Sequence, residues 1–217
     1  MLLNIGCTDS LNIAVFVPLY DKILMNYPHL DLSIQSHHSS ELYGMLSEHN
    51  IDIGFVYHQL HYKNIISEKL FEEKLYLVQS EHPTVEKPIV HTDELDPTKE
   101  LFLSWDDNFQ IWHDRWLSSV SRPHISADTI TLLDRLWKNA DTWMIAPESV
   151  IHELSRYRKV YVSELKNPAP NRICYKIKHK YPKTTSKRAV ELFEEILEQL
   201  LHLERKEIPI GEIWGGQ

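Results

Sequence analysis

Apolar and alternating runs in the first quarter of the chain predict three β-strands, at residues 2–7, 30–35 and 51–56. Two stretches with the spacing of helices lie between these strands, at residues 11–25 and 39–46. Within the first stretch, Pro18 is expected to kink the helix or to mark the first turn of a new one. Strands and helices that alternate in this way are typical of a parallel α/β sheet with right-handed crossovers.

A second α/β series follows a polar segment that contains three prolines and predicts a loop over residues 81–99. Strands are predicted at residues 65–79 (one or two), 101–105, 124–127, 143–147, 159–162 and 173–177. Helices are predicted at residues 108–120, 129–139, 148–156 and 186–205. Long strands near residues 75–80 and 165–175 would join the two series. The pattern predicts two lobes around a ligand cleft, with residues 1–78 and 168–207 in lobe I, 79–167 in lobe II and 208–217 as a loose tail.

The charge balance argues against a chain that grips nucleic acid by itself. The 217 residues carry 23 Lys and Arg against 31 Asp and Glu, a net charge of −8, which opposes binding to phosphates. Residues 171–190 are basic and contain no acid, and we interpret this run as a solvated strand and loop. It comprises Arg172, Lys176, Lys178, Lys180, Lys183, Lys187 and Arg188.

Targeting signals, membrane spans and a disulfide framework find no support in the sequence. No run approaches the ~20 apolar residues of a membrane span, and the N-terminus lacks the basic region of a signal peptide. Cys7 and Cys174 are too few for a disulfide scaffold. We therefore expect a cytoplasmic protein that does not bind membranes.

Candidate ligand contacts follow the predicted strands, because α/β sheets bind their ligands beyond the carboxyl ends of the strands. Thr8, Asp9 and Ser10 follow the first strand, and His38 and Ser39 precede the second helix. Helix N-termini attract small anions, although hydroxyl residues at these positions often only cap the helix. The Asp9 carboxylate would repel an anion or favour an amine, so an amino acid is one possible ligand.

Several ordered motifs make the chain similar to the effector-binding domain of LysR-type transcriptional regulators. The family's pattern reads L-x-I-G, a helix containing L-P, y-P, s-x-e-L and l-D-l-a-i. The matching segments here are Leu3–Gly6, Phe16–Tyr20, Tyr27-Pro28, Ser39–Leu42 and Ile51–Phe55. Later matches are Val78 with His82-Pro83, Ile145–Pro147 and the predicted last helix, so the resemblance covers roughly residues 2–205.

The resemblance implies an α/β fold of two Rossmann-like lobes, type 2 periplasmic-binding-protein-like, with a small-molecule effector between them. The effector would be an organic acid or an amino acid. Family positions that contact effector match Ser10 and Ser39 in lobe I and Ser104, Trp105 and Thr129 in lobe II. Family members carry an N-terminal winged helix-turn-helix, which we expect to be absent here because the first strand begins at Leu2. A homodimer or homotetramer would contact DNA only through that missing domain.

Two departures from the family pattern lie near the expected cleft. Residues 139–143 replace the usual G-x-G, and His37-His38 stand where a glycine is common before the second helix. Both departures bear on the identity of the ligand more than on the fold.

Other functions find less support. His58 and His61 have the spacing of a helical metal site but fall in a polar segment without further ligands, so we expect no metal and no cofactor. Phosphate-loop, nucleophile-elbow and zincin motifs are missing, and Asp106-Asp107 is expected to cap a helix, which argues against an enzyme. Cys7 is expected to be a buried thiol. A free-standing solute-binding protein of the same architecture is the alternative function.

Overall fold

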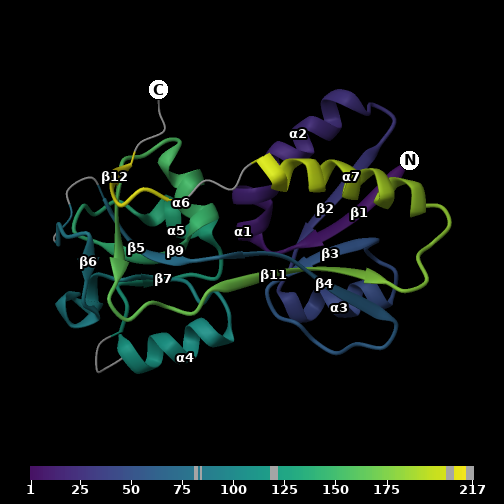
Figure 1. Cartoon of the computed structure of the whole chain (residues 1–217). Helices are drawn as coiled ribbons and strands as arrows, with labels where there is room; N and C mark the ends of the chain where they lie inside the picture. Colours follow the sequence, from purple (N-terminus) through teal and green to yellow (C-terminus); the bar gives the residue numbers. More distant parts are fainter. Residues whose placement is uncertain (81–82, 84, 118–121, 204–207, 214–217) are drawn as a thin grey trace. The chain divides into compact units, whose positions relative to one another are not determined.

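A computed structural model describes residues 1–80, 83, 85–117, 122–203 and 208–213, and divides the chain into two compact units (Figure 1). Unit 1 contains residues Met1–Phe71 and Ile173–Lys206, and unit 2 contains Glu72–Arg172 and Glu207–Gln217. Unit 2 also includes residues 72–78 and 168–172, which the sequence pattern assigned to lobe I. The division falls inside two long strands, β4 (Ile65–Glu73) and β11 (Arg172–His179).

Unit 1 is built on a five-stranded sheet in the order β2-β1-β3-β11-β4. Its other strands are β1 (Leu2–Cys7), β2 (Asp31–Ser36) and β3 (Ile53–Val56). These three strands are parallel, as predicted, whereas β11 runs antiparallel to β3. In the register of the sheet, Cys7 at the end of β1 pairs with both Ser36 and Phe55. The carboxyl ends of the three parallel strands therefore lie side by side.

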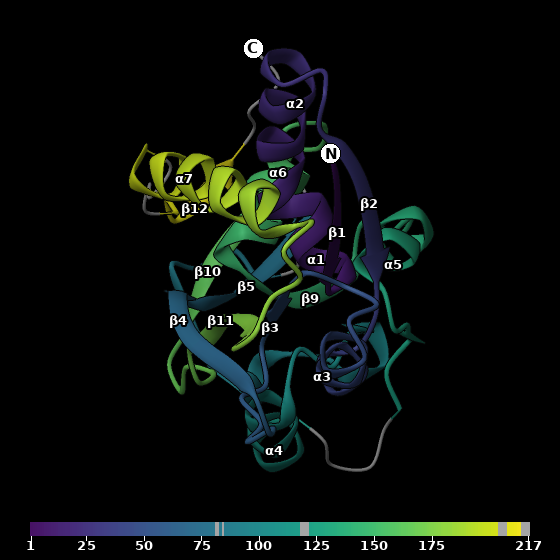
Figure 2. The ribbon, with the colours of Figure 1, turned by 90° about the vertical axis from the view of Figure 1, so that its right-hand side faces the viewer.

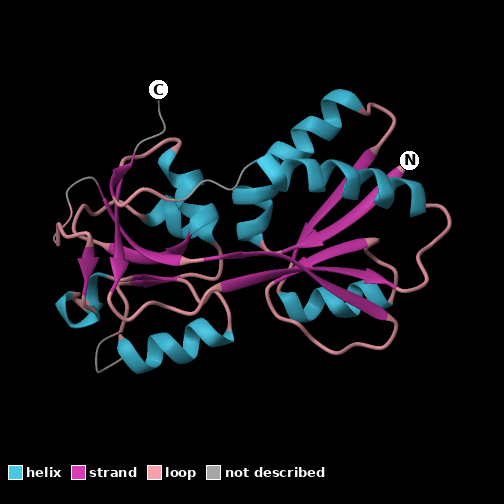
Figure 3. Ribbon diagram, viewed as in Figure 1, coloured by secondary structure: helices cyan, strands magenta, loops and turns pink. Residues whose placement is uncertain are grey.

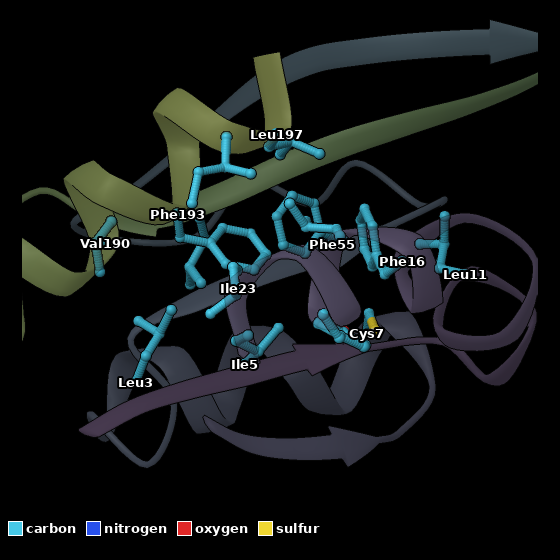
Figure 4. Packing of buried hydrophobic residues seen from close by; sticks show 14 of the residues in the cluster. Leu3, Ile5, Cys7, Leu11, Phe16, Ile23, Phe55, Val190, Phe193 and Leu197 are labelled. Carbon is cyan, nitrogen blue, oxygen red and sulfur yellow. Dashed lines mark hydrogen bonds between the residues drawn. The ribbon is translucent and has the colours of Figure 1, made fainter. Parts of the chain in front are cut away.

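Helices cover both faces of this sheet (Figures 1 and 3). The helices α2 (Val17–Asn26) and α7 (Lys187–Leu203) pack on one face, and α3 (Ser39–Ser47) packs on the other. Figure 4 shows the larger core, where Phe193 of α7 meets Phe55 of β3 with ring centroids 5.9 Å apart. The smaller core joins Leu42 and Leu46 of α3 to Ile177 of β11.

The predicted helix over residues 11–25 is divided into three parts. The short helix α1 (Asp9–Leu11) continues into a wide π-helical turn, Asn12–Phe16, and α2 then begins with Pro18 in its first turn. Proline has no N–H to donate to the preceding turn but is well suited to the start of a helix. Pro18 therefore begins a new helix, one of the two outcomes expected from the sequence.

Unit 2 contains a five-stranded sheet, in which β12, β10, β5 and β9 are neighbours in that order and β6 also pairs with β10. The short strands β7 and β8 form a separate parallel pair. The strands are β5 (Leu75–Ser80), β6 (Ile89–Val90), β7 (Leu101–Phe102), β8 (Ile125–Ser126), β9 (Trp143–Pro147), β10 (Val160–Leu165) and β12 (Gly211–Ile213). The helices are α4 (Asp107–Trp116), α5 (Ile130–Leu136) and α6 (Glu148–Ser155). Figure 2 shows both units from the side.

Three expectations for unit 2 differ in part from the structure. The loose tail contains β12, which pairs antiparallel with β10 from Gly211 to Ile213. The predicted loop over 81–99 contains β6 and two 3₁₀ turns, Thr92–Glu94 and Pro97–Lys99. The strand predicted over 101–105 ends at Phe102. These elements are too short for a periodic pattern. The strands β6 and β12 pair with β10, which is distant in sequence, whereas Glu94 and Asp96 cap the two 3₁₀ turns locally.

A buried hydrogen bond between two side chains connects α4 to the segment before β7. His113 and Glu100 are 5% and 2% exposed, and His113 Nε2 lies 2.8 Å from Glu100 Oε1. The rings of Phe102 and Phe109 lie 4.6 and 5.8 Å from the His113 ring. Removing one partner would leave the other polar group buried without its hydrogen bond, which is destabilising.

The basic run over residues 171–190 is only partly a solvated surface. Arg172 is 3% exposed, and Lys176 and Lys178 bind Glu194 of α7 at 2.5 and 2.7 Å. Burial of the Glu194 carboxyl opposes its ionisation, but hydrogen bonds from the two lysines outweigh burial and lower its pKa. The charges of the first half of the run therefore attach α7 to the sheet.

Cys7 belongs to the larger core and is fully buried. Its Sγ donates to Asn12 Oδ1 at 2.7 Å, and the Tyr20 hydroxyl donates to the same oxygen at 2.7 Å. Burial raises the pKa of the Cys7 thiol to about 12, so very little thiolate exists at neutral pH. Cys174 is also a buried free thiol.

Glu194→Gln is expected to lower the free energy of unfolding by about 1–3 kcal/mol at about pH 7, because Lys176 and Lys178 lose their shared carboxylate. The pKa of Glu194 is lower in the folded state than the ~4.3 of an unfolded glutamate. The stabilisation is therefore complete above that value and lost as pH falls through the folded pKa. Urea unfolding at about pH 7 and about pH 3.5 measures both effects. Glu195→Gln, an exposed position on the same helix, is the control, and an equal loss in both variants would contradict the prediction.

The Cys7 thiol is expected to react with Ellman's reagent at least ~100-fold more slowly than an exposed thiol, because it is buried and protonated. Ser47→Cys in the Cys174→Ser background supplies the exposed reference, since Ser47 is exposed on α3. The thiol should become reactive once guanidinium chloride unfolds the chain. Equal rates for Cys7 and the Ser47→Cys thiol in the folded protein would contradict the assignment.

Candidate functional site

The predicted contacts of unit 1 meet at the carboxyl ends of β1 and β2. The His37 N–H donates to the Cys7 carbonyl at 3.1 Å, so the segment after β2 lies against the end of β1. Asn12 Nδ2 donates to Ser36 Oγ at 2.7 Å and strengthens this connection. Thr8, Asp9 and Ser10 on one segment and His38 and Ser39 on the other are therefore neighbours in unit 1. The structure thus brings together the two segments that carry these five candidates.

Ser39 does not cap α3, contrary to the alternative interpretation. It is the first residue of the helix, and His38 occupies the N-cap position. The Ser39 Oγ accepts a hydrogen bond from the Tyr57 N–H at 3.1 Å, which connects the start of α3 to the segment after β3. The His38 N–H donates to Glu41 Oε2 at 3.0 Å. The hydroxyl of Ser39 thus lies where three parallel strands end.

The three residues after β1 differ in their access to a ligand. Thr8 is at the N-cap position of α1, but its side chain makes no capping hydrogen bond. Its Oγ1 lies 3.5 Å from the Ser10 Oγ, and Ser10 is only 5% exposed. Asp9 is partly exposed and begins α1. Thr8 and Asp9 are therefore better placed than Ser10 to touch a ligand.

The charges around these segments are mixed. The N-terminus of α3 carries a partial positive charge, and Glu41 brings a carboxylate to the same turn, with Oε2 3.7 Å from His37 Nδ1. Asp9 adds a second carboxylate next to the end of β1. Such a surface suits a ligand that carries both a negative and a positive group.

The candidates of unit 2 also follow neighbouring parallel strands. Ser104 and Trp105 follow β7 and Thr129 follows β8, and these strands pair from Leu101 with Ile125 to Phe102 with Ser126. Thr129 caps α5, since its Oγ1 accepts from the Leu132 N–H at 3.4 Å. Ser104 is exposed. Asp106 caps α4 by accepting from the Phe109 N–H at 2.8 Å, as expected.

Trp105 has an internal role that the sequence did not indicate. It is 4% exposed, and its Nε1 donates to the Ile145 carbonyl at 2.7 Å. The guanidinium of Arg172 lies 4.9 Å from the ring centroid, and its Nη2 donates to the Trp105 carbonyl at 3.2 Å. No local pattern marks an arginine that is buried against a tryptophan 67 residues away. Trp105 and Arg172 together hold the end of β7 in place.

A separate cavity of about 450 Å³ lies within unit 2, and none of the predicted site residues lines it. Its lining includes four glutamates, Glu72, Glu73, Glu148 and Glu164. Three of their carboxylates accept hydrogen bonds from the protein: Glu72 from Asn171 at 2.7 Å, Glu73 from the Ser149 N–H at 3.0 Å and Glu148 from Tyr76 at 3.3 Å. These carboxylates thus support the surrounding loops.

Metal-binding and membrane-spanning features are also absent from the described residues. The described residues contain no group of three or more His, Cys, Asp or Glu side chains arranged to hold a metal ion. Among the described helices, none combines the length and the apolar character needed to cross a membrane.

Two comparisons connect the chain to known sequences. A protein-family model described as the LysR substrate binding domain matches residues 1–201. The HTH-type transcriptional regulator CzcR of Bacillus anthracis is 22% identical over 163 residues, which are 74% of this chain and 54% of CzcR. The chain therefore spans about half the length of this relative.

Solved structures share the fold over almost the whole chain. The reduced form of the OxyR regulatory domain from Pseudomonas aeruginosa aligns with a TM-score of 0.74 at 16% identity, covering 96% of this chain and 98% of that one. The regulatory domain of MexT, a transcriptional activator in the same organism, gives 0.76 at 11% identity, covering 92% and 100%. The predicted type 2 periplasmic-binding-protein-like fold is confirmed.

The family match covers the candidate residues of both units and all the described strands except β12. It begins with β1, includes the segments that carry Ser39 and Thr129, and ends within α7. The resemblance noted from the sequence is thereby confirmed, and this chain belongs to the LysR substrate-binding domain family.

Proposed function

We propose that this chain is the ligand-sensing regulatory domain of a LysR-type transcription factor. It binds a small metabolite, an organic acid or an amino acid, and signals to a DNA-binding domain outside this chain. The observation that carries the proposal is the same in each unit: hydroxyl side chains and helix starts follow the carboxyl ends of neighbouring parallel strands. In unit 1 these side chains are Thr8 and Ser39, and in unit 2 they are Ser104 and Thr129.

The charges of unit 1 favour an amino acid among the possible effectors. A ligand carboxylate would accept hydrogen bonds near the start of α3, where Ser39 lies. A ligand ammonium group would be attracted by the Asp9 carboxylate after β1. An organic acid without an amine would meet Asp9 as a like charge.

Signalling requires that the effector bind two states of the protein with different affinities. The units are joined through β4 and β11, so a change in either unit reaches the other through continuous backbone. A homodimer or homotetramer would transmit this change to DNA-binding domains, and the net charge of −8 fits a module that leaves sequence reading to them. Such a regulator acts in the cytoplasm and has no enzymatic role.

Ser39→Ala and Thr129→Ala are each expected to weaken effector binding by about tenfold or more, because each removes a hydroxyl contact to the ligand. A thermal-shift screen of amino acids and organic acids first identifies a ligand through the rise in Tm on binding. Calorimetric titration of the variants then measures the affinity. Ser40→Ala, at an exposed neighbouring position, is the control. Unchanged affinity in both variants would refute this placement.

Asp9→Asn distinguishes the two classes of effector. For an amino acid, removal of the carboxylate is expected to weaken binding by about tenfold or more, because the ammonium group loses its counter-charge. For an organic acid, the same substitution removes a repulsion and strengthens binding. An affinity that does not change with Asp9→Asn would place the ligand away from α1.

A further inference from the structure

The second half of the basic run differs from the first half. Whereas Lys176 and Lys178 bind Glu194, Lys180, Lys183 and Lys187 are exposed and form no ion pair with a carboxylate of the described residues. Arg188 lies 3.8 Å from Glu191 and is 71% exposed. The segment that joins β11 to α7 therefore presents cations without counter-charges at one end of unit 1 (Figure 1).

Three contacts bring a further lysine to this segment and fix its shape. The Lys180 N–H donates to the Asn64 carbonyl at 2.7 Å, which places Lys63, also exposed and without an ion pair in the described part of the chain, next to Lys180. Lys183 Nζ donates to the His49 carbonyl at 2.7 Å. The Lys187 N–H donates to the Lys183 carbonyl at 3.1 Å. We call Lys63, Lys180, Lys183 and Lys187 the basic end of unit 1.

The start of α7 adds an independent electrostatic argument. A helix N-terminus carries a partial positive charge and is stabilised by acidic residues. The first turn of α7 contains no acid and instead contains Lys187 and Arg188. This arrangement is unfavourable in the free protein, and a bound polyanion would relieve it. The ring of Tyr181, 62% exposed, lies 5.8 Å below Lys180 Nζ and adds an aromatic surface to the group.

We propose that the basic end of unit 1 binds the phosphate backbone of double-stranded DNA without reading its sequence. Duplex DNA presents a negative charge about every 1.7 Å along its axis, so a compact group of lysines meets several phosphates at once. Lysine ammonium groups bind phosphate as point charges and do not require particular bases. The first turn of α7 has no acidic residue to balance its positive charge, which further favours a dense polyanion as the binding partner.

The proposal rests on the proposed function, because that function brings DNA to the protein. Four lysines on a chain of net charge −8 give weak binding in isolation. Once a DNA-binding domain holds the duplex nearby, the second contact becomes intramolecular and gains from a high effective concentration. The basic end would then favour conformations in which the regulatory domain lies against the flanking DNA.

The test measures binding of this chain, without effector, to a fluorescein-labelled duplex of about 24 base pairs by anisotropy between about 20 and 150 mM salt. Four phosphate contacts give a slope of log K against log salt of about −3.6. Lys63→Gln, Lys180→Gln and Lys187→Gln combined are expected to weaken binding at least ~10-fold and to reduce the slope to about −0.9. The matched control combines Lys74→Gln, Lys138→Gln and Lys166→Gln, which makes the same charge change at exposed lysines of unit 2.

Two results would overturn the proposal. One is a triple variant of the basic end that binds DNA as tightly as the control variant. The other is tighter binding to poly-glutamate than to DNA, which would identify an acidic protein as the partner. Retention of the Tm in both variants shows that the fold is intact. Because no effector is present, this outcome is independent of the Ser39 and Thr129 titrations that test the proposed function.

Discussion

The close approach of α3 to β1 at Gly6 is the constraint on which the arrangement of unit 1 depends. A Cβ atom at Gly6 would lie 2.5 Å from Leu42 Cδ2 and 2.7 Å from Ile51 Cδ1. A larger residue would force the ends of these two buried side chains to move, so the absence of a Cβ lets them pack directly on the strand near its carboxyl end. The packing fixes the position of α3, and with it Ser39 and the residues after β2. Gly6 is thus both part of the L-x-I-G motif and a point of close contact between β1 and the helix that begins at Ser39.

Pairing and burial decide which charges can act on a ligand or partner. Glu194 binds Lys176 and Lys178, Glu100 forms a hydrogen bond with His113, and Arg172 is held against Trp105. These side chains are buried or partly buried and stabilise the units. Two surface groups of unit 1 differ in charge: Asp9 and Glu41 lie near the carboxyl ends of the parallel strands, and lysines lie at the opposite end of β11 and the start of α7. The first suits a small polar ligand and the second suits a polyanion.

The sequence predicted most accurately those strands and helices whose own residues show a clear periodicity or a helix-start residue. The strands at 2–7 and 51–56, the helix that begins at Ser39 and the amphipathic last helix follow from periodicity and helix-start residues. The grouping of Thr8 with Ser39 followed from one rule, that neighbouring parallel strands end together. No local sequence pattern indicated three of the observed contacts, because each joins residues far apart in the chain. These are the hydrogen bond from Tyr57 to Ser39, the Trp105–Arg172 contact and the pairing of β12 with β10.

By itself, the sequence determined the fold class, the family and the segments that carry the candidate contacts, since these depend on local periodicity and on motifs in order. Only the tertiary structure decided which polar side chains are exposed and which are used internally. Arg172 and Lys180 belong to the same basic run, yet one is 3% exposed beside Trp105 and the other is on the surface. The reason is that burial and charge pairing depend on partners from other elements, which long-range packing alone brings together.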